Sequence, residues 1–120
     1  MGKAQRWFAV WGGEVHPYVR TTQRQKWVDQ RYKKYAAWKD AFRASLNVQD
    51  FPSDLDKEKR YSIEIVVMAS GKLRCDGDNQ IKAILDGAFR QDRRIKSIKY
   101  EVEERAGFDE ARICLEEMAS

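Results

Sequence analysis

An expected amphipathic helix near residue 80 constrains the fold of this chain more than any other feature. Its apolar positions follow the spacing i, i+3, i+4, i+7 and i+8, and they are Ile81, Ile84, Leu85, Ala88 and Phe89. Residues at this spacing share one face of an α-helix, so that face is expected to pack against a hydrophobic core. Four aspartates lie in the same stretch, residues 75–92. So many carboxylates beside a core helix suggest that some of them have a function.

The other segments of regular pattern are four strands and one further helix. Dense Ile, Val and aromatic residues, or apolar alternation, predict strands at Arg6–Gly12, Tyr61–Ala69, Ile95–Arg105 and Ala111–Met118. Helical spacing predicts a helix over Asp29–Leu46, and the helix near residue 80 is expected to start at about Asp78, as its N-cap. The order β-α-β-α-β-β predicts an α+β fold, in which a single domain over residues 1–120 has a mixed β-sheet and two main helices.

Length and composition limit the classes of protein that this chain can represent. A chain of 120 residues with 42% hydrophobic residues is expected to fold around one core, although 35% of its residues are charged. Cys75, Cys114 and His16 lack the spacing of a zinc site or a disulfide framework. No apolar run is long enough to span a membrane and no signal sequence is evident, so a cytoplasmic location is expected.

The charge of the chain is distributed unevenly. Residues 1–60 carry 13 Lys and Arg against 7 Asp and Glu, whereas residues 61–120 carry 10 against 12. A basic first half and a slightly acidic second half suit a protein that attracts a polyanion through one region and holds cations in the other. Ordinary solvated surface explains the same charges about equally well, so charge alone does not decide.

The acidic element before the second expected helix has the composition of a magnesium site. Asp76 and Asp78 are separated only by Gly77, and on an extended approach to the helix their side chains would point to the same side. Mg²⁺ prefers oxygen ligands and is commonly held by one or two carboxylates together with phosphate oxygens. Lys82 lies one turn beyond Asp78 and could place a positive charge on a phosphoryl oxygen. Asp92 lies in the basic run "RQDRR", which suits a carboxylate that works against a nucleic acid backbone.

Each of these residues also has a purely structural interpretation. Taken singly, Asp78 is most often a helix cap, Lys82 a solvated lysine, and Asp92 a turn residue. Asp86 lies four residues after Lys82, so an ion pair along the helix is its simplest explanation. A second Asp-x-Asp element, "SDLDKEKR", leads into a strand and is expected to be a solvated loop.

The segment "DGDNQIKAILD" resembles the signature of the RusA-type Holliday junction resolvases, an Asp-x-Asp-Asn element that opens a helix with a lysine four residues after the second Asp. The matching residues are Asp76, Asp78, Asn79 and Lys82, and Asp92 stands in the place of the family's later aspartate. The resemblance is specific over residues 74–95. Elsewhere it extends only to the order of strands and helices.

The resemblance implies a homodimeric, Mg²⁺-dependent endonuclease of DNA recombination and repair, often encoded by phages or prophages, which cuts four-way junctions by paired nicks. It implies that Asp76, Asp78 and Asp92 bind the metal and that Lys82 assists at the phosphate. A two-fold dimer with one site per chain fits a junction with two-fold symmetry. The chain departs from the family in three features, namely Gln91 in the place of a second adjacent aspartate, a shorter linker before Asp92, and a reduced Pro- and Arg-rich loop.

Basic residues flank the acidic element and fill the first half of the chain. The candidates for contacts to DNA phosphates are Arg20, Arg24, Lys26, Arg31, Lys33, Lys34, Arg74, Arg93 and Arg94. Tyr18 and Trp27 could stack on unpaired bases, although a core position is the commoner role of an aromatic residue.

Two other functions remain open. A non-catalytic DNA-binding protein of the same fold would use its carboxylates only to cap and brace the helix. A metal-dependent phosphatase or other small-molecule enzyme is a weaker alternative, because no nucleotide-binding glycine loop is present.

Overall fold

The computed structural model describes residues 5–19, 30–73 and 75–119. The elements along the chain are β1 (Arg6–Trp11), α1 (Gln30–Val48), β2 (Tyr61–Met68), α2 (Gly77–Ala88), β3 (Ile95–Glu103) and β4 (Glu110–Glu117). The predicted order β-α-β-α-β-β and the predicted α+β fold are therefore confirmed. Within the described part of the chain, neither helix is long and apolar enough to cross a membrane.

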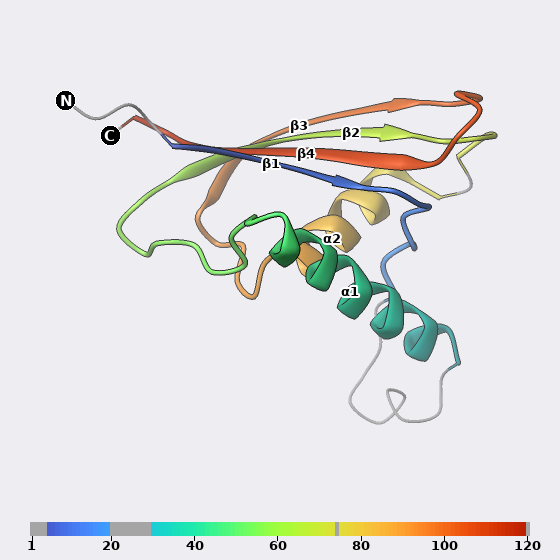
Figure 1. The fold of residues 1–120 in the computed structure, drawn as a ribbon, viewed down its shortest axis with the longest axis horizontal. Helices are drawn as coiled ribbons and strands as arrows, with labels where there is room; N and C mark the ends of the chain where they lie inside the picture. The colour runs from blue at the N-terminus through green and yellow to red at the C-terminus, as the bar shows by residue number, and fades with distance from the viewer. Residues whose placement is uncertain (1–4, 20–29, 74, 120) are drawn as a thin grey trace.

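The four strands form one mixed sheet in the order β1-β4-β2-β3. β4 is antiparallel to both β1 and β2, whereas β2 and β3 are parallel. Because β2 and β3 run in the same direction, α2 must carry the chain back from the carboxyl end of β2 to the amino end of β3. Both helices lie on one face of the sheet (Figure 1). Neither of these two helices lies on the opposite face.

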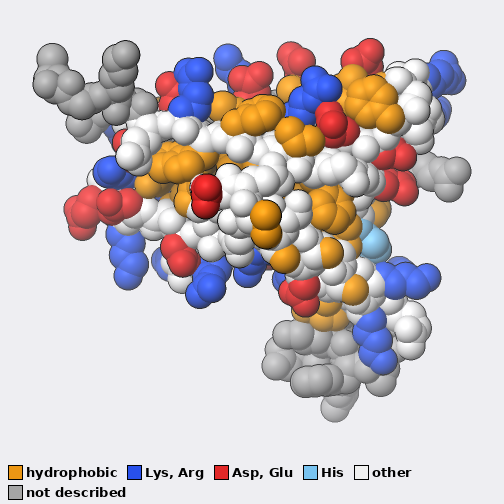
Figure 2. All heavy atoms as spheres, in the orientation of Figure 1, with side chains coloured by type: hydrophobic (Ala, Val, Ile, Leu, Met, Phe, Trp, Pro, Cys, Tyr) orange, Lys and Arg blue, Asp and Glu red, His pale blue; other side chains and the backbone are white. Residues whose placement is uncertain are grey.

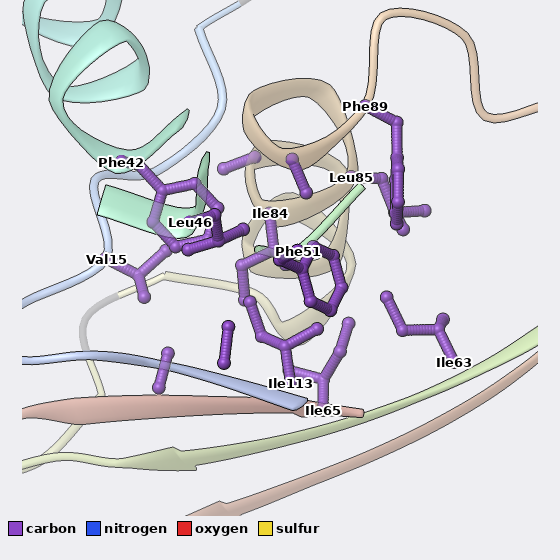
Figure 3. Packing of buried hydrophobic residues seen from close by; sticks show 14 of the residues in the cluster. Val15, Phe42, Leu46, Phe51, Ile63, Ile65, Ile84, Leu85, Phe89 and Ile113 are labelled. Atoms are coloured by element: carbon purple, nitrogen blue, oxygen red, sulfur yellow. The ribbon is translucent and has the colours of Figure 1, made fainter. Parts of the chain in front are cut away.

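The hydrophobic core fills the space between the helices and the sheet. Phe42 and Leu46 reach it from α1, while Ile84 and Phe89 reach it from α2 and its C-cap (Figure 3). Ile65 in the centre of the sheet is fully buried. The apolar face predicted for α2 is thus confirmed as a core face, which holds the helix against the sheet.

Close contact between the two helices depends on Gly87. A Cβ atom at this position would lie 2.8 Å from Cδ2 of Phe42, which is closer than such atoms approach in real structures. Arg43 of α1 also binds the end of α2, because its guanidinium donates to the carbonyl oxygens of Asp86 and Gly87, each at 2.8 Å. The last carbonyls of a helix have no partner inside the helix, so Arg43 caps them and ties α1 to α2.

A side chain covers part of the β1 edge of the sheet. The backbone N–H of Val10 in β1 donates to Oε1 of Gln49 at 2.8 Å, and Nε2 of Gln49 donates to the carbonyl of Val10 at 2.9 Å. The amide of Gln49 thus occupies the hydrogen-bonding groups that a neighbouring strand would use. Trp7 and Trp11 pack partly against the core, whereas Phe8 on the face without helices is 58% exposed.

Candidate functional site

The acidic element lies where the chain leaves the sheet and enters α2. Asp76 is the N-cap residue, with extended backbone angles φ −63° and ψ 143°, and Gly77 is the first helical residue. The helix therefore starts one residue before Asp78, its N-cap is Asp76 instead of the expected Asp78, and the extended approach that would have aligned the two carboxylates does not form. Either aspartate has the side chain of an N-cap residue, so residue type alone did not distinguish them.

Gly77 allows a close approach, although the neighbour is a side chain of the sheet. A Cβ atom at residue 77 would lie 3.0 Å from Cε2 of Tyr100 in β3. The hydroxyl of Tyr100 also donates to Oε1 of Gln80, which is only 2% exposed. These two contacts hold the first turn of α2 against the sheet and so fix the position of the acidic element.

The side chains of Asp76 and Asp78 both lie at the surface of the protein. Asp76 is exposed, and its side chain makes no capping hydrogen bond. The side chain of Asp78 is 80% exposed, and its Oδ2 lies 3.5 Å from Nζ of Lys82. Two exposed carboxylates, with a lysine one turn beyond Asp78, can supply oxygen ligands to a Mg²⁺ ion that keeps most of its water ligands.

A cleft adjoins this element on the side of the sheet. It has a volume of about 670 Å³, and it lies between the segment after β1, the carboxyl end of β2 and the first turn of α2. Its polar lining includes Glu14, Lys72, Gln80 and Asp109. The backbone N–H of Tyr18 donates to the carbonyl of Asn79 at 3.4 Å, so the segment after β1 is attached to the same helical turn.

Cys75 lies in an acidic environment at the entrance to α2. Burial raises the pKa of its thiol, and the negative charges of Asp76 and Glu14 raise it further. A raised pKa keeps the thiol protonated and makes it a poor nucleophile or metal ligand near neutral pH. The same charge effect shows that Glu14 brings a third negative charge to the surroundings of Asp76.

Asp92 lies at the other end of α2. The loop that contains it leads into β3, and the carbonyl of Arg94 in that loop accepts from the N–H of Tyr61 at the start of β2. Asp76 follows the carboxyl end of β2, so the 12 residues of α2, roughly 18 Å of helix, separate the two carboxylates. Among the described residues, no group of three or more His, Cys, Asp and Glu side chains lies close enough to hold a metal ion.

A basic cleft of about 770 Å³ surrounds this second end of α2. Its charged lining consists of Asp54, Lys57, Arg90, Arg93, Arg94 and Lys96. Figure 2 shows Lys and Arg side chains gathered at this end of the molecule, at the lower left of the view. Arg93 and Arg94 therefore lie beside Asp92 as expected, but away from Asp76 and Asp78.

Asp86 has the bracing role that was expected, but its partners are different. Its Oδ2 accepts from the hydroxyl of Tyr35 at 2.6 Å and lies 3.3 Å from Nζ of Lys39. Both partners are on α1, whereas Lys82 is paired with Asp78. Burial and the hydrogen bond to Asp86 raise the pKa of Tyr35 well above its ordinary value. Asp86 thus links the two helices and has no place in the acidic element.

The remaining predicted DNA contacts are only partly described. Lys33 and Lys34 are exposed on α1. Arg20, Arg24, Lys26, Trp27 and Arg74 lie outside the described residues. Tyr18 packs against the core and meets the ring of Tyr35 edge-on, with centroids 5.6 Å apart, so it has the core role that competed with base stacking.

Sequence reasoning missed Glu14 and Gln80. Glu14 was the one acidic residue in the segment of residues 12–28, and that contrast was the available signal. Gln80 gave no signal, because a glutamine beside an apolar helix face normally points to solvent.

No family model and no curated protein matches this chain.

Proposed function

We propose that this chain is a Mg²⁺-dependent endonuclease, active on branched DNA such as four-way junctions in the cytoplasm. The observation that carries the proposal is the arrangement of Asp76, Asp78 and Lys82 at the N-terminus of α2. Two exposed carboxylates and one lysine lie within the first two turns of α2 and its N-cap, next to a cleft. The resemblance to the RusA-type resolvases over residues 74–95 supports the same function.

In this proposal each residue has a stated role. Asp76 and Asp78 would hold Mg²⁺, which when bound supplies an activated water and neutralises phosphate charge. Lys82 donates to a non-bridging oxygen of the scissile phosphate and stabilises the charge that develops there. Its contact with Asp78 keeps the ammonium group directed toward the metal ligands while no DNA is bound.

The basic residues at the two ends of the molecule would bind the DNA backbone. Arg93 and Arg94 border the basic cleft beside Asp92, and Lys33 and Lys34 are exposed on α1. Contacts to phosphates position a duplex without reading its sequence, which suits an enzyme that selects a branched structure. Asp92 lies at the opposite end of α2 from Asp76 and Asp78, so it lies beside this basic cleft and does not complete their metal site.

One experiment tests the catalytic role directly. Four-way junctions, flaps and linear duplexes are incubated with the wild type, Asp78→Asn and Asp40→Asn, with Mg²⁺ and with a chelator. The wild type and Asp40→Asn, which changes an exposed carboxylate of α1, are expected to cut junctions only with Mg²⁺. Asp78→Asn is expected to bind junctions without cutting them.

The same experiment distinguishes the alternative function. A wild type that binds junctions but leaves them uncut with Mg²⁺ or Mn²⁺ would show that the carboxylates are structural and that the protein only binds DNA. No contact among the described residues favours a small-molecule phosphatase.

A further inference from the structure

The outer edge of β3 has the properties of an unpaired interface. β3 is the last strand of the sheet, and seven of its nine residues are exposed. Ile98 and Val102 lie in register with the buried residues Ile63 and Val67 of β2, so they belong to the helix side of the sheet. They are nevertheless 44% and 38% exposed. An edge strand with exposed apolar side chains is a template for a further strand.

The two edges of the sheet differ. Gln49 occupies the hydrogen-bonding groups of Val10 at the β1 edge. Among the residues described, no side chain makes a comparable pair of hydrogen bonds to the backbone of β3. The β3 edge is also longer, with nine residues against six. A partner that adds a strand would therefore bind at β3.

The sequence of β3 suits a second copy of the same chain as the partner. Around Tyr100 the strand reads Lys99-Tyr100-Glu101, and Ile98 and Val102 lie one step farther out. When two such strands run antiparallel, the order of one is reversed against the other. Lys99 then faces Glu101, and Ile98 faces Val102. Both facing pairs are favourable, and each occurs twice in the pair of strands.

We propose that β3 pairs antiparallel with β3 of a second copy, about a two-fold axis at Tyr100. The axis runs perpendicular to the sheet, and the two sheets join into one that is twice as wide. This surface is the dimer contact of the proposed nuclease, and in that respect it rests on the proposed function. The strand contacts themselves require no catalytic activity.

The register follows from the charges. Facing residues of an antiparallel pair lie on the same side of the sheet, so the two-fold axis must lie at a residue and not between two residues. A change of register therefore moves the axis from one residue to the next. With the axis at Lys99 or at Glu101, that residue would face its own copy and place like charges opposite each other. With the axis at Tyr100, opposite charges face each other and the apolar residues meet on the helix side. Only this register among the three satisfies both conditions.

The proposed pairing also determines where the two acidic elements lie in the dimer. Because the axis is perpendicular to the sheet, the helices of both copies lie on the same face of the joined sheet. Gly77 lies against the ring of Tyr100, so each α2 begins beside the axis. The two Asp76–Asp78 elements therefore face the same side of the dimer, where two strands of one branched DNA can reach both.

Charge exchange across the interface tests the proposal. Oligomeric state is measured by sedimentation equilibrium for the wild type, Lys99→Glu, Glu101→Lys and the double variant Lys99→Glu/Glu101→Lys. The wild type is expected at twice the chain mass of 14.1 kDa. Each single variant places like charges in both facing pairs and is expected to weaken dimerisation roughly tenfold or more, whereas the double variant restores opposite charges and wild-type dimerisation.

The outcomes separate the interface from the catalytic function. Both substituted residues, Lys99 and Glu101, are exposed, so folding should be preserved, and far-UV circular dichroism checks it. A monomeric wild type, single variants that dimerise normally, or a double variant that stays as weak as the single ones would each overturn the proposal. A normal dimer that fails to cut junctions would count against the nuclease function and leave the interface intact.

Discussion

The guanidinium of Arg43 donates from Nε to the carbonyl oxygen of Gly87 at 2.8 Å. This bond joins the middle of α1 to the last turn of α2, where backbone carbonyls lack helical partners. We predict that Arg43→Ala lowers the free energy of unfolding by about 2–3 kcal/mol, because partly buried carbonyls lose a charged donor. Urea unfolding followed by circular dichroism measures the change.

Two variants complete that experiment. Arg43→Lys keeps the charge but lacks the planar guanidinium whose two nitrogens each reach a carbonyl, so an intermediate loss is expected. Lys34→Ala removes an exposed cation from the same helix and is expected to change the free energy of unfolding by less than about 0.5 kcal/mol. An Arg43→Ala protein as stable as Lys34→Ala would show that the cap contributes nothing.

Gly87→Ala tests the close approach of the two helices. Alanine favours a helix by about 1 kcal/mol over glycine, but the new Cβ would meet Phe42 at 2.8 Å. Overpacking of a core typically costs about 1–3 kcal/mol, so a net loss of roughly 1–2 kcal/mol is expected. Gly71→Ala is the matched control, since no atom lies within 4 Å of its added Cβ. Thermal unfolding that ranks Gly87→Ala at or above the wild type would contradict the packing.

Alkaline pH is expected to destabilise the protein partly through Tyr35. Burial and Asp86 raise the pKa of Tyr35 in the folded state above its ordinary value of 10.0. The stability that comes from this shift is complete below pH 10 and falls as the pH rises further, because the unfolded chain then releases the proton more readily. Between pH 9 and 11 the free energy of unfolding of Tyr35→Phe should fall less steeply than that of the wild type. Equal slopes would mean that Tyr35 does not contribute.

The Lys82→Ala variant should show whether Lys82 acts in the chemical step or in DNA binding. Loss of a cation that acts on the developing charge is expected to lower kcat for junction cleavage about 100-fold. Junction affinity should change little, since one exposed lysine among many basic residues contributes little to binding. Arg6→Ala, which removes an exposed cation from β1, is expected to retain full activity. A loss confined to KM would assign Lys82 to binding alone.

Much of the fold followed from the sequence because hydrophobic periodicity identifies helices and strands directly. The core face of α2 and the order of all six elements were predicted in this way. The placement of Asp92 was not, because periodicity says nothing about which ends of two strands meet. The parallel pairing of β2 and β3 decides that question, since it forces α2 to run the length of the sheet between Asp76 and Asp92.

The sequence pattern also could not predict the local details of the site. Asp76 and Asp78 are equivalent as cap residues by type, and the contact of Gly77 with Tyr100 depends on a strand that follows 18 residues later. The partners of Asp86 come from another helix, so the spacing along α2 pointed to Lys82 instead of Lys39. Contacts between distant segments thus account for most of the differences.

The amide of Gln49 at Val10 limits how far the sheet can grow. A chain with two unpaired edges could add further chains on both sides without end, as fibrils do. Here Gln49 occupies the hydrogen-bonding groups of Val10 in the β1 edge, so among the described strands we expect a further chain to pair at β3 and not at β1. We therefore expect assembly to stop at two chains, and Gln49→Ala to produce higher-order aggregates that the wild type does not form.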